Sequence, residues 1–284
     1  MKSKVAIVEL DGNVQGSLNR ALSLVGNIDD LNTKDRTVVI KVGVFDPQMG
    51  AHSTVDTVGA IVNCFSQASR IFLAESDNYM GKALERLQIW KTLFSDRVMP
   101  FSLSDDPRTR KVTIAGDEIN LSHVLFKPNV LVSTHILRDY KKGSLIKNLF
   151  GLMPQRTKAK YHRKLNTVLL DLYEAVGGID LAVLDATYSY FMGEATPDTL
   201  KDPSHCRVKT NTLIVGRDAV AVETVGAVLA GMNPRKMPLL QKAAERGFGE
   251  CDLSNVEVMG RSFGEVREEF SAALEAMREK WSKH

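Results

Sequence analysis

Ionisable side chains occur where several apolar, β-branched runs of the sequence end. Lys41 lies in the run TVVIKV, Glu75 ends RIFLAE and Asp185 ends IDLAVLD. His52 lies in the loop after the run that contains Lys41, and His135 follows the run NVLVS. A lysine can hold an anion, a histidine can transfer protons near neutral pH, and carboxylates can orient a substrate or coordinate a metal ion. Because ligands of open parallel sheets bind beyond the carboxyl ends of the strands, we expect these side chains to converge at one edge.

The segment 138–164 concentrates positive charge around a short apolar stretch, 145–153. It contains nine Lys and Arg residues and one acid, whereas the whole chain has a net charge of +3. Since the rest of the chain is net acidic, the charge is local, and a small anion fits it better than a nucleic acid does. A nucleic-acid interface and a solvated, lysine-rich cover are the alternatives.

Within this segment, Ser144 is a good N-cap for a short helix, and free N–H groups at a helix N-terminus attract anions. Lys141 and Lys142 precede that terminus and Lys147 lies one turn into it. The spacing predicts a phosphate or carboxylate pocket. His162, next to a tyrosine, could serve as a general base or metal ligand, or lie on the surface.

Strand-like runs alternate with helical patterns along the chain. The strand-like runs are 4–10, 37–42, 70–75, 129–133, 179–185, 212–215 and 255–259, with a hairpin over 111–121. The helical patterns lie at 14–25, 53–65, 82–90, 145–150, 165–176, 218–231 and the C-terminus. This alternation predicts a single α/β domain over 1–284: a mostly parallel, Rossmann-like sheet with helices on both faces, carrying the hairpin and the basic helical insertion 138–164.

The composition narrows the class of protein. Cys64, Cys206 and Cys251 form no CxxC pair, which argues against a disulfide framework, a zinc knuckle or a self-contained iron–sulfur site and favours a reducing cytoplasm. No apolar run approaches the ~20 residues of a membrane span. We therefore expect a cytoplasmic protein that does not bind membranes.

Several strings in the chain together resemble one known family. They are VVIKVGVF, TVDTVGAIVNCF and IFLAES in the first half, and SLIKNLFGLMP, AKYHRKL, DLYEAV, IDLAVLDATYSYF, VGRDAVAVETVGAVLAGMNP and AAERGFG in the second. In this order they are similar to the domain of unknown function 362 family, and the match extends to about residue 249. The resemblance implies a Rossmann-like fold distantly similar to the N-terminal half of nickel-pincer lactate racemase.

The family pattern also marks individual positions. By resemblance, Lys41, Lys147, Asn148, Tyr161, His162 and Asp185 match it. The sequence departs from it at Val42 and Gly43, at STHIL (where His135 is offset), and at Glu75 and Glu223, where aspartate is more usual. Many relatives carry ferredoxin-type cysteine runs, which are absent here, so a redox role would need a protein partner.

The leading hypothesis is an enzyme acting on a small anionic molecule. The basic segment would hold the anion, His135 or His162 would act as general acid or base, and Glu75 and Asp185 would orient the substrate or a metal. The alternatives are an accessory protein for iron–sulfur or cofactor maturation, and a metal site built from His52, Glu75, His135 or Asp185. The sequence does not name a cofactor, reaction or oligomeric state.

Overall fold

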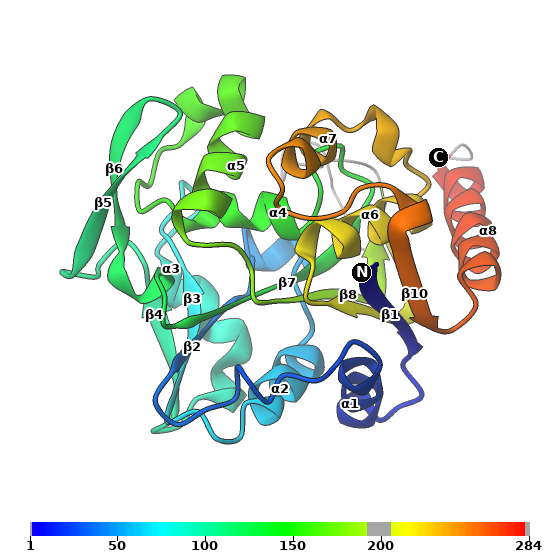
Figure 1. Ribbon diagram of the computed structural model, residues 1–284, viewed down its shortest axis with the longest axis horizontal. Coiled ribbons are helices and arrows are strands. Elements are labelled where there is room, and N and C mark those ends of the chain that lie inside the picture. The colour runs from blue at the N-terminus through cyan, green and yellow to red at the C-terminus, as the bar shows by residue number, and fades with distance from the viewer. Residues whose placement is uncertain (1, 192–205, 282–284) are drawn as a thin grey trace.

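The computed structural model describes residues 2–191 and 206–281 of the chain. In this part, eight strands form one sheet. They are β1 (Ser3–Glu9), β2 (Thr37–Lys41), β3 (Arg70–Glu75), β4 (Val98–Ser102), β7 (Val130–Arg138), β8 (Leu181–Tyr190), β9 (Arg207–Gly216) and β10 (Val256–Gly260). Their order across the sheet is β10-β1-β9-β8-β7-β2-β3-β4 (Figure 1).

The sheet is mostly parallel, as the sequence predicted. In the described residues, β9 pairs antiparallel with β1 and β8, and every other pairing in the sheet is parallel. The carboxyl ends of β2, β3, β7 and β8 therefore lie at the same edge. That edge is where open parallel sheets bind ligands.

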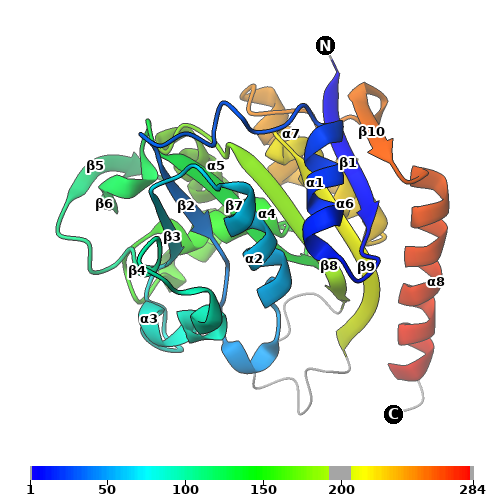
Figure 2. The ribbon, with the colours of Figure 1, turned by 90° about the horizontal axis from the view of Figure 1, so that it is seen from below.

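Helices cover both faces of the sheet. Figures 1 and 2 show α1 (Val14–Leu24) and α2 (Val55–Cys64) on one face. Strand residues alternate between the two cores, because successive side chains of a strand point to opposite faces. In β1, Ala6 and Val8 pack with α1 and α2, whereas Val5 and Ile7 join the core on the other face. The helices in that second core are α4 (Leu145–Asn148), α5 (Leu165–Ala175), α6 (Ala219–Leu229), α7 (Pro238–Glu245) and α8 (Phe263–Trp281).

The predicted hairpin is confirmed and forms a separate two-stranded sheet. It consists of β5 (Thr109–Ile114) and β6 (Asp117–Ser122), which pair antiparallel. The turn between them is Ala115-Gly116, one residue earlier than expected. Both turn residues have positive φ, 51° and 90°, which suits a tight connection.

Several elements differ from the sequence-based expectation; β8 and β9, for example, are each longer than the runs that predicted them. β4 was missed because Pro100 interrupts it, but β4 is an edge strand, where a proline removes no essential ladder bond. The helix expected at 82–90 is a single turn, α3 (Ala83–Arg86), followed by a 3₁₀ stretch, Leu87–Leu93. β7 continues five residues past its predicted end, because it pairs with β8 on one side beyond the point where β2 stops.

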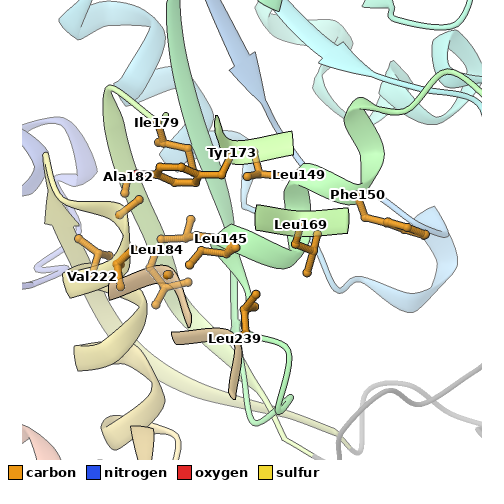
Figure 3. Close-up of a cluster of buried hydrophobic side chains, with 14 of the residues drawn as sticks. Leu145, Leu149, Phe150, Leu169, Tyr173, Ile179, Ala182, Leu184, Val222 and Leu239 are labelled. Atoms are coloured by element: carbon orange, nitrogen blue, oxygen red, sulfur yellow. The ribbon is translucent and has the colours of Figure 1, made fainter. Parts of the chain in front are cut away.

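The apolar part of the basic segment packs onto the sheet, as predicted. Leu145, Leu149, Leu152 and Met153 are fully buried, and Figure 3 shows the first two against side chains of α5, β8 and α6. The helix predicted over 145–150 is α4 followed by a 3₁₀ turn, Leu149–Leu152, which continues through Gly151 instead of ending there. The segment is therefore attached to the fold through its own hydrophobic residues.

Two further observations concern a membrane span and a disulfide framework, both of which the sequence argued against. None of their helices is both long and apolar enough to cross a membrane. Cys64, Cys206 and Cys251 are free thiols.

Candidate functional site

A cavity of about 310 Å³ lies where β2, β3 and β7 end. Its walls are the loops that follow β2 and β3, the last residues of β7, and the basic segment. The lining includes Lys41, Gly43, Asp46, Glu75, His135, Arg138, Lys147, Asn148, Gly151, Arg156, Lys158 and His162. The basic segment therefore covers the carboxyl edge of the sheet and shares a cavity with the loop side chains beneath it.

A buried ion pair lies in the wall of the cavity. The Lys41 Nζ atom is 2.8 Å from Glu75 Oε2 and 2.8 Å from Asn148 Oδ1, and Lys41 is only 1% exposed. Burial lowers the pKa of Lys41, and the Glu75 carboxylate opposes that shift. Since both charges are removed from water, each depends on the other, and the pair acts as one neutral unit.

The Glu75 carboxylate also fixes the two loops that form the wall. It accepts hydrogen bonds from the backbone N–H of Val44 at 3.0 Å and of Ser76 at 2.9 Å. The buried Arg86 guanidinium ties the same loops together, because it donates to the backbone carbonyls of Val44 and Ser76. Glu75 is thus an organising residue as well as a lining residue.

Asn148 connects the cover segment to the sheet. Its amide nitrogen donates to the backbone carbonyls of Lys41 at 2.9 Å and Thr134 at 3.1 Å, and lies 3.2 Å from the Ser133 hydroxyl. Nearby, Gly151 lies directly over the ion pair. A Cβ atom at Gly151 would be 2.5 Å from Glu75 Oε1 and 2.8 Å from Lys41 Nζ, so a side chain there would have to displace the ion pair.

Lys158 is a second buried amine at the cavity, and no sequence pattern had marked it. It is 8% exposed, and its Nζ donates to the backbone carbonyl of Asp77 at 2.7 Å and to the Ser76 hydroxyl at 3.2 Å. Burial lowers the pKa of Lys158 to about 8; Glu75 opposes the shift and Lys41 adds to it. Unlike Lys41, it has neutral oxygen atoms as its hydrogen-bond partners.

Cationic side chains outnumber acidic ones around the cavity. Of the described lining residues, the cations are Lys41, Arg138, Lys147, Arg156 and Lys158, and the acids are Asp46 and Glu75. Lys147 Nζ lies 4.9 Å from the centroid of the Phe150 ring, which holds its stem along the wall. Because Glu75 is already paired with Lys41, the lining keeps a net positive charge, which suits an anionic ligand.

Two histidines line the cavity in different environments. His135 is buried, and burial, reinforced by Arg138, holds the pKa of its imidazole well below the usual range. Its Nδ1 lies 3.0 Å from the backbone carbonyl of Ile136, a contact that requires the proton on Nδ1 and leaves a lone pair on Nε2. His162 is exposed at the rim, with its ring 5.1 Å from that of Phe150.

The N-terminus of α4 is not available to a ligand, which corrects the prediction for Ser144. The backbone N–H groups of Ser144 and Ile146 donate to the buried carboxylate of Glu223 at 2.7 and 2.9 Å. The protein thus supplies its own anion to this helix terminus. Lys141 and Lys142, which were predicted to help hold the anion, also lie outside the cavity lining.

Asp185 lies outside the cavity lining and has a structural environment. One carboxylate oxygen accepts from the N–H and hydroxyl of Thr54, the N-cap of α2, at 2.8 and 3.0 Å. The other accepts from the N–H and hydroxyl of Thr187 at 2.9 and 2.6 Å. His52 is likewise outside the lining, packed against Trp90.

The possible metal site proposed from the sequence is not assembled. Within residues 2–191 and 206–281, no three His, Cys, Asp or Glu side chains come together as ligands for a metal ion. His52, Glu75, His135 and Asp185 are instead divided between the cavity wall and the N-cap region of α2.

The fold and cavity define an α/β protein with a cationic cavity at the carboxyl edge of a mostly parallel sheet. A family model described as a domain of unknown function (DUF362) matches residues 38–228. Since this is more than half of the chain, the protein belongs to that family, as the sequence resemblance indicated. A search of curated proteins found no match.

Proposed function

We propose that this protein binds a small phosphate- or carboxylate-bearing molecule in the cavity and acts on it as an enzyme. The observation that carries the proposal is the charge of the cavity lining, which has five cationic side chains and two carboxylates. One of the cations, Lys41, is paired with the carboxylate of Glu75, so the other four face the single carboxylate of Asp46. An excess of cations over acids in a partly enclosed space is stabilised by an anion. The position at the carboxyl edge of the sheet, and the Rossmann-like classification that we retain as a prediction, support the same site.

The lining residues divide into two groups by chemistry. Lys147, Arg138 and Arg156 supply N–H donors to the anionic group of the ligand. His135 presents a neutral imidazole with a lone pair on Nε2, and His162 lies exposed at the rim; these two side chains are the candidate acid–base groups. Glu75 contributes indirectly, because it holds the two wall loops in place and serves as the counter-ion of Lys41. Asp185 has no part in this proposal.

An exposed apolar patch near 150–153 would have favoured the alternative hypothesis, an accessory protein with a protein partner. Phe150 is 8% exposed, and Leu152 and Met153 are fully buried, so that surface is absent from the described structure. A ligand-binding enzyme is therefore the function that we favour, in the cytoplasm as the cysteine content suggested.

Calorimetric titration with inorganic phosphate and with small mono- and dicarboxylates tests the proposal. The double variant Lys147→Met/Arg156→Met should lower the affinity at least about tenfold, since a charge-assisted hydrogen bond contributes about 1.5–3 kcal/mol. The matched control is Lys111→Met, on the exposed hairpin, where Lys111 pairs with Glu118 at 3.2 Å. Equal loss of affinity in both variants, or no binding to the wild-type protein, would refute the proposed site.

A further inference from the structure

We propose that Lys158 is a covalent catalytic residue that condenses with the carbonyl carbon of the anionic ligand to form an imine. The ligand would be a carbonyl compound with an anionic group, either a 2-oxo acid or a phosphorylated aldehyde. This inference rests on the proposed function, because the cationic lining must hold the anionic group while the carbonyl meets the amine.

The contrast between the two buried lysines at the cavity carries the inference. Lys41 donates to the carboxylate of Glu75, which favours its charged ammonium form and opposes the lowering of its pKa by burial. Lys158 makes its hydrogen bonds to two neutral oxygens, the Asp77 carbonyl and the Ser76 hydroxyl. A neutral amine can satisfy both with its two N–H groups and keep its lone pair for a third direction. Because Lys158 lines the cavity, a ligand there can meet that lone pair.

The protonation equilibrium of Lys158 supports this role. With a pKa of about 8, about one quarter of the amines are neutral at pH 7.5, against about one in a thousand for an ordinary lysine. The burial of the side chain and the nearby positive charge of Lys41 are the causes. Desolvation in a cationic pocket is a recognised way to activate an amine for imine formation.

The reaction is balanced without an external oxidant or reductant. The Nζ lone pair attacks the carbonyl carbon, the carbonyl oxygen takes up a proton, and Nζ releases one, giving a carbinolamine. Loss of the hydroxyl with a further proton as water then gives the C=N bond. The Ser76 hydroxyl, 3.2 Å from Nζ, is placed to exchange these protons, and His162 lines the same cavity.

Reductive trapping on the intact protein tests the inference. Wild-type protein is incubated at pH 7.5 with glyoxylate in one arm and glyceraldehyde 3-phosphate in the other, each with cyanoborohydride, and the modified residue is located by peptide mass spectrometry. We expect the adduct on Lys158 in at least one arm, and the arm that labels identifies the anionic group. Labelling at Lys158 should exceed that of an exposed lysine by up to about 250-fold, the ratio of the two neutral fractions.

Two variants distinguish a failure of the imine proposal from a failure of the anion site. Lys158→Arg keeps the positive charge and should bind the unreactive anion in calorimetry, but it should lose the adduct. Lys160→Arg, an exposed lysine paired with Asp117 at 2.7 Å, is the matched control and should label at Lys158 as the wild type does. If anions bind but Lys158 labels no more than Lys160 in either arm, the imine role is wrong while the anion site stands. If no anion binds, the proposed function fails. Because the adduct is mapped on the wild-type protein, the test does not depend on the folding of either variant.

Discussion

The buried amine of Lys158 should leave a measurable signature in the pH dependence of folding stability. Its pKa is about 8 in the folded protein, against an ordinary value of 10.5. Because a difference of one between two pKa values corresponds to about 1.4 kcal/mol, the charged form is disfavoured in the folded state by about 3 kcal/mol. Lys158→Met removes the charge while retaining a side chain of similar length.

The sign follows from the two protonation equilibria. Below pH 8, Lys158 is charged in both the folded and the unfolded chain, and the folded state carries the full cost of about 3 kcal/mol. Between pH 8 and 10.5 the unfolded chain keeps the proton that the folded protein has released, so the stability of the wild type rises with pH. Above pH 10.5 both forms are neutral and the cost has disappeared.

Urea unfolding of the wild type and of Lys158→Met, at about pH 7 and about pH 10.5, measures this difference. The stability of the variant relative to the wild type should fall by about 3 kcal/mol between the two pH values. The hydrogen bonds lost from Ser76 and Asp77 lower the stability of the variant by a similar amount at both pH values, so they cancel. Titration of other side chains cancels in the same way. Lys160→Met, at an exposed position, should show no such change, and a flat difference for Lys158→Met would refute the reasoning.

Three further substitutions test other parts of the site. Glu75→Gln should lower the free energy of unfolding by about 3–5 kcal/mol in urea titrations, because it leaves the charge of Lys41 buried without a counter-ion; a loss below about 1 kcal/mol would contradict the pairing. Gly151→Ala should lower the melting temperature, since its Cβ would be 2.5 Å from a carboxylate oxygen, at a cost of about 1–3 kcal/mol; an unchanged melting curve would show that the cover can move. Asp185→Asn should cost about 1 kcal/mol through the N-cap of α2 but leave anion affinity in calorimetry unchanged, and a tenfold loss of affinity would return Asp185 to the ligand site.

Local sequence patterns predicted most of the sheet and part of the cavity. Lys41 and Glu75 could be placed together because each ends a buried parallel strand, and such ends share an edge. The basic segment could be placed over that edge because its own apolar residues required burial. β4 was not predicted because Pro100 is untypical of a strand, and an edge strand paired with β3 tolerates it.

The remaining site features depend on partners far away in the sequence. The amide of Ser144 is bonded to Glu223, 79 residues later, and no local pattern distinguishes a helix terminus that awaits a ligand from one already bonded to the protein. Lys158 resembles the other basic residues of its segment in every local respect. Its burial against Ser76 and Asp77, more than 80 residues earlier, becomes visible only in three dimensions.

The position of Glu75 in this protein couples folding stability to ligand contact. Its carboxylate holds two loops and Lys41 together, so substitutions in this wall of the cavity alter stability and ligand contacts at the same time. Lys147 and Arg156 are carried by the covering segment instead, and both are more accessible than the buried ion pair. Substitutions at these two positions can therefore change the contacts to a ligand with less effect on folding stability than substitutions of Glu75.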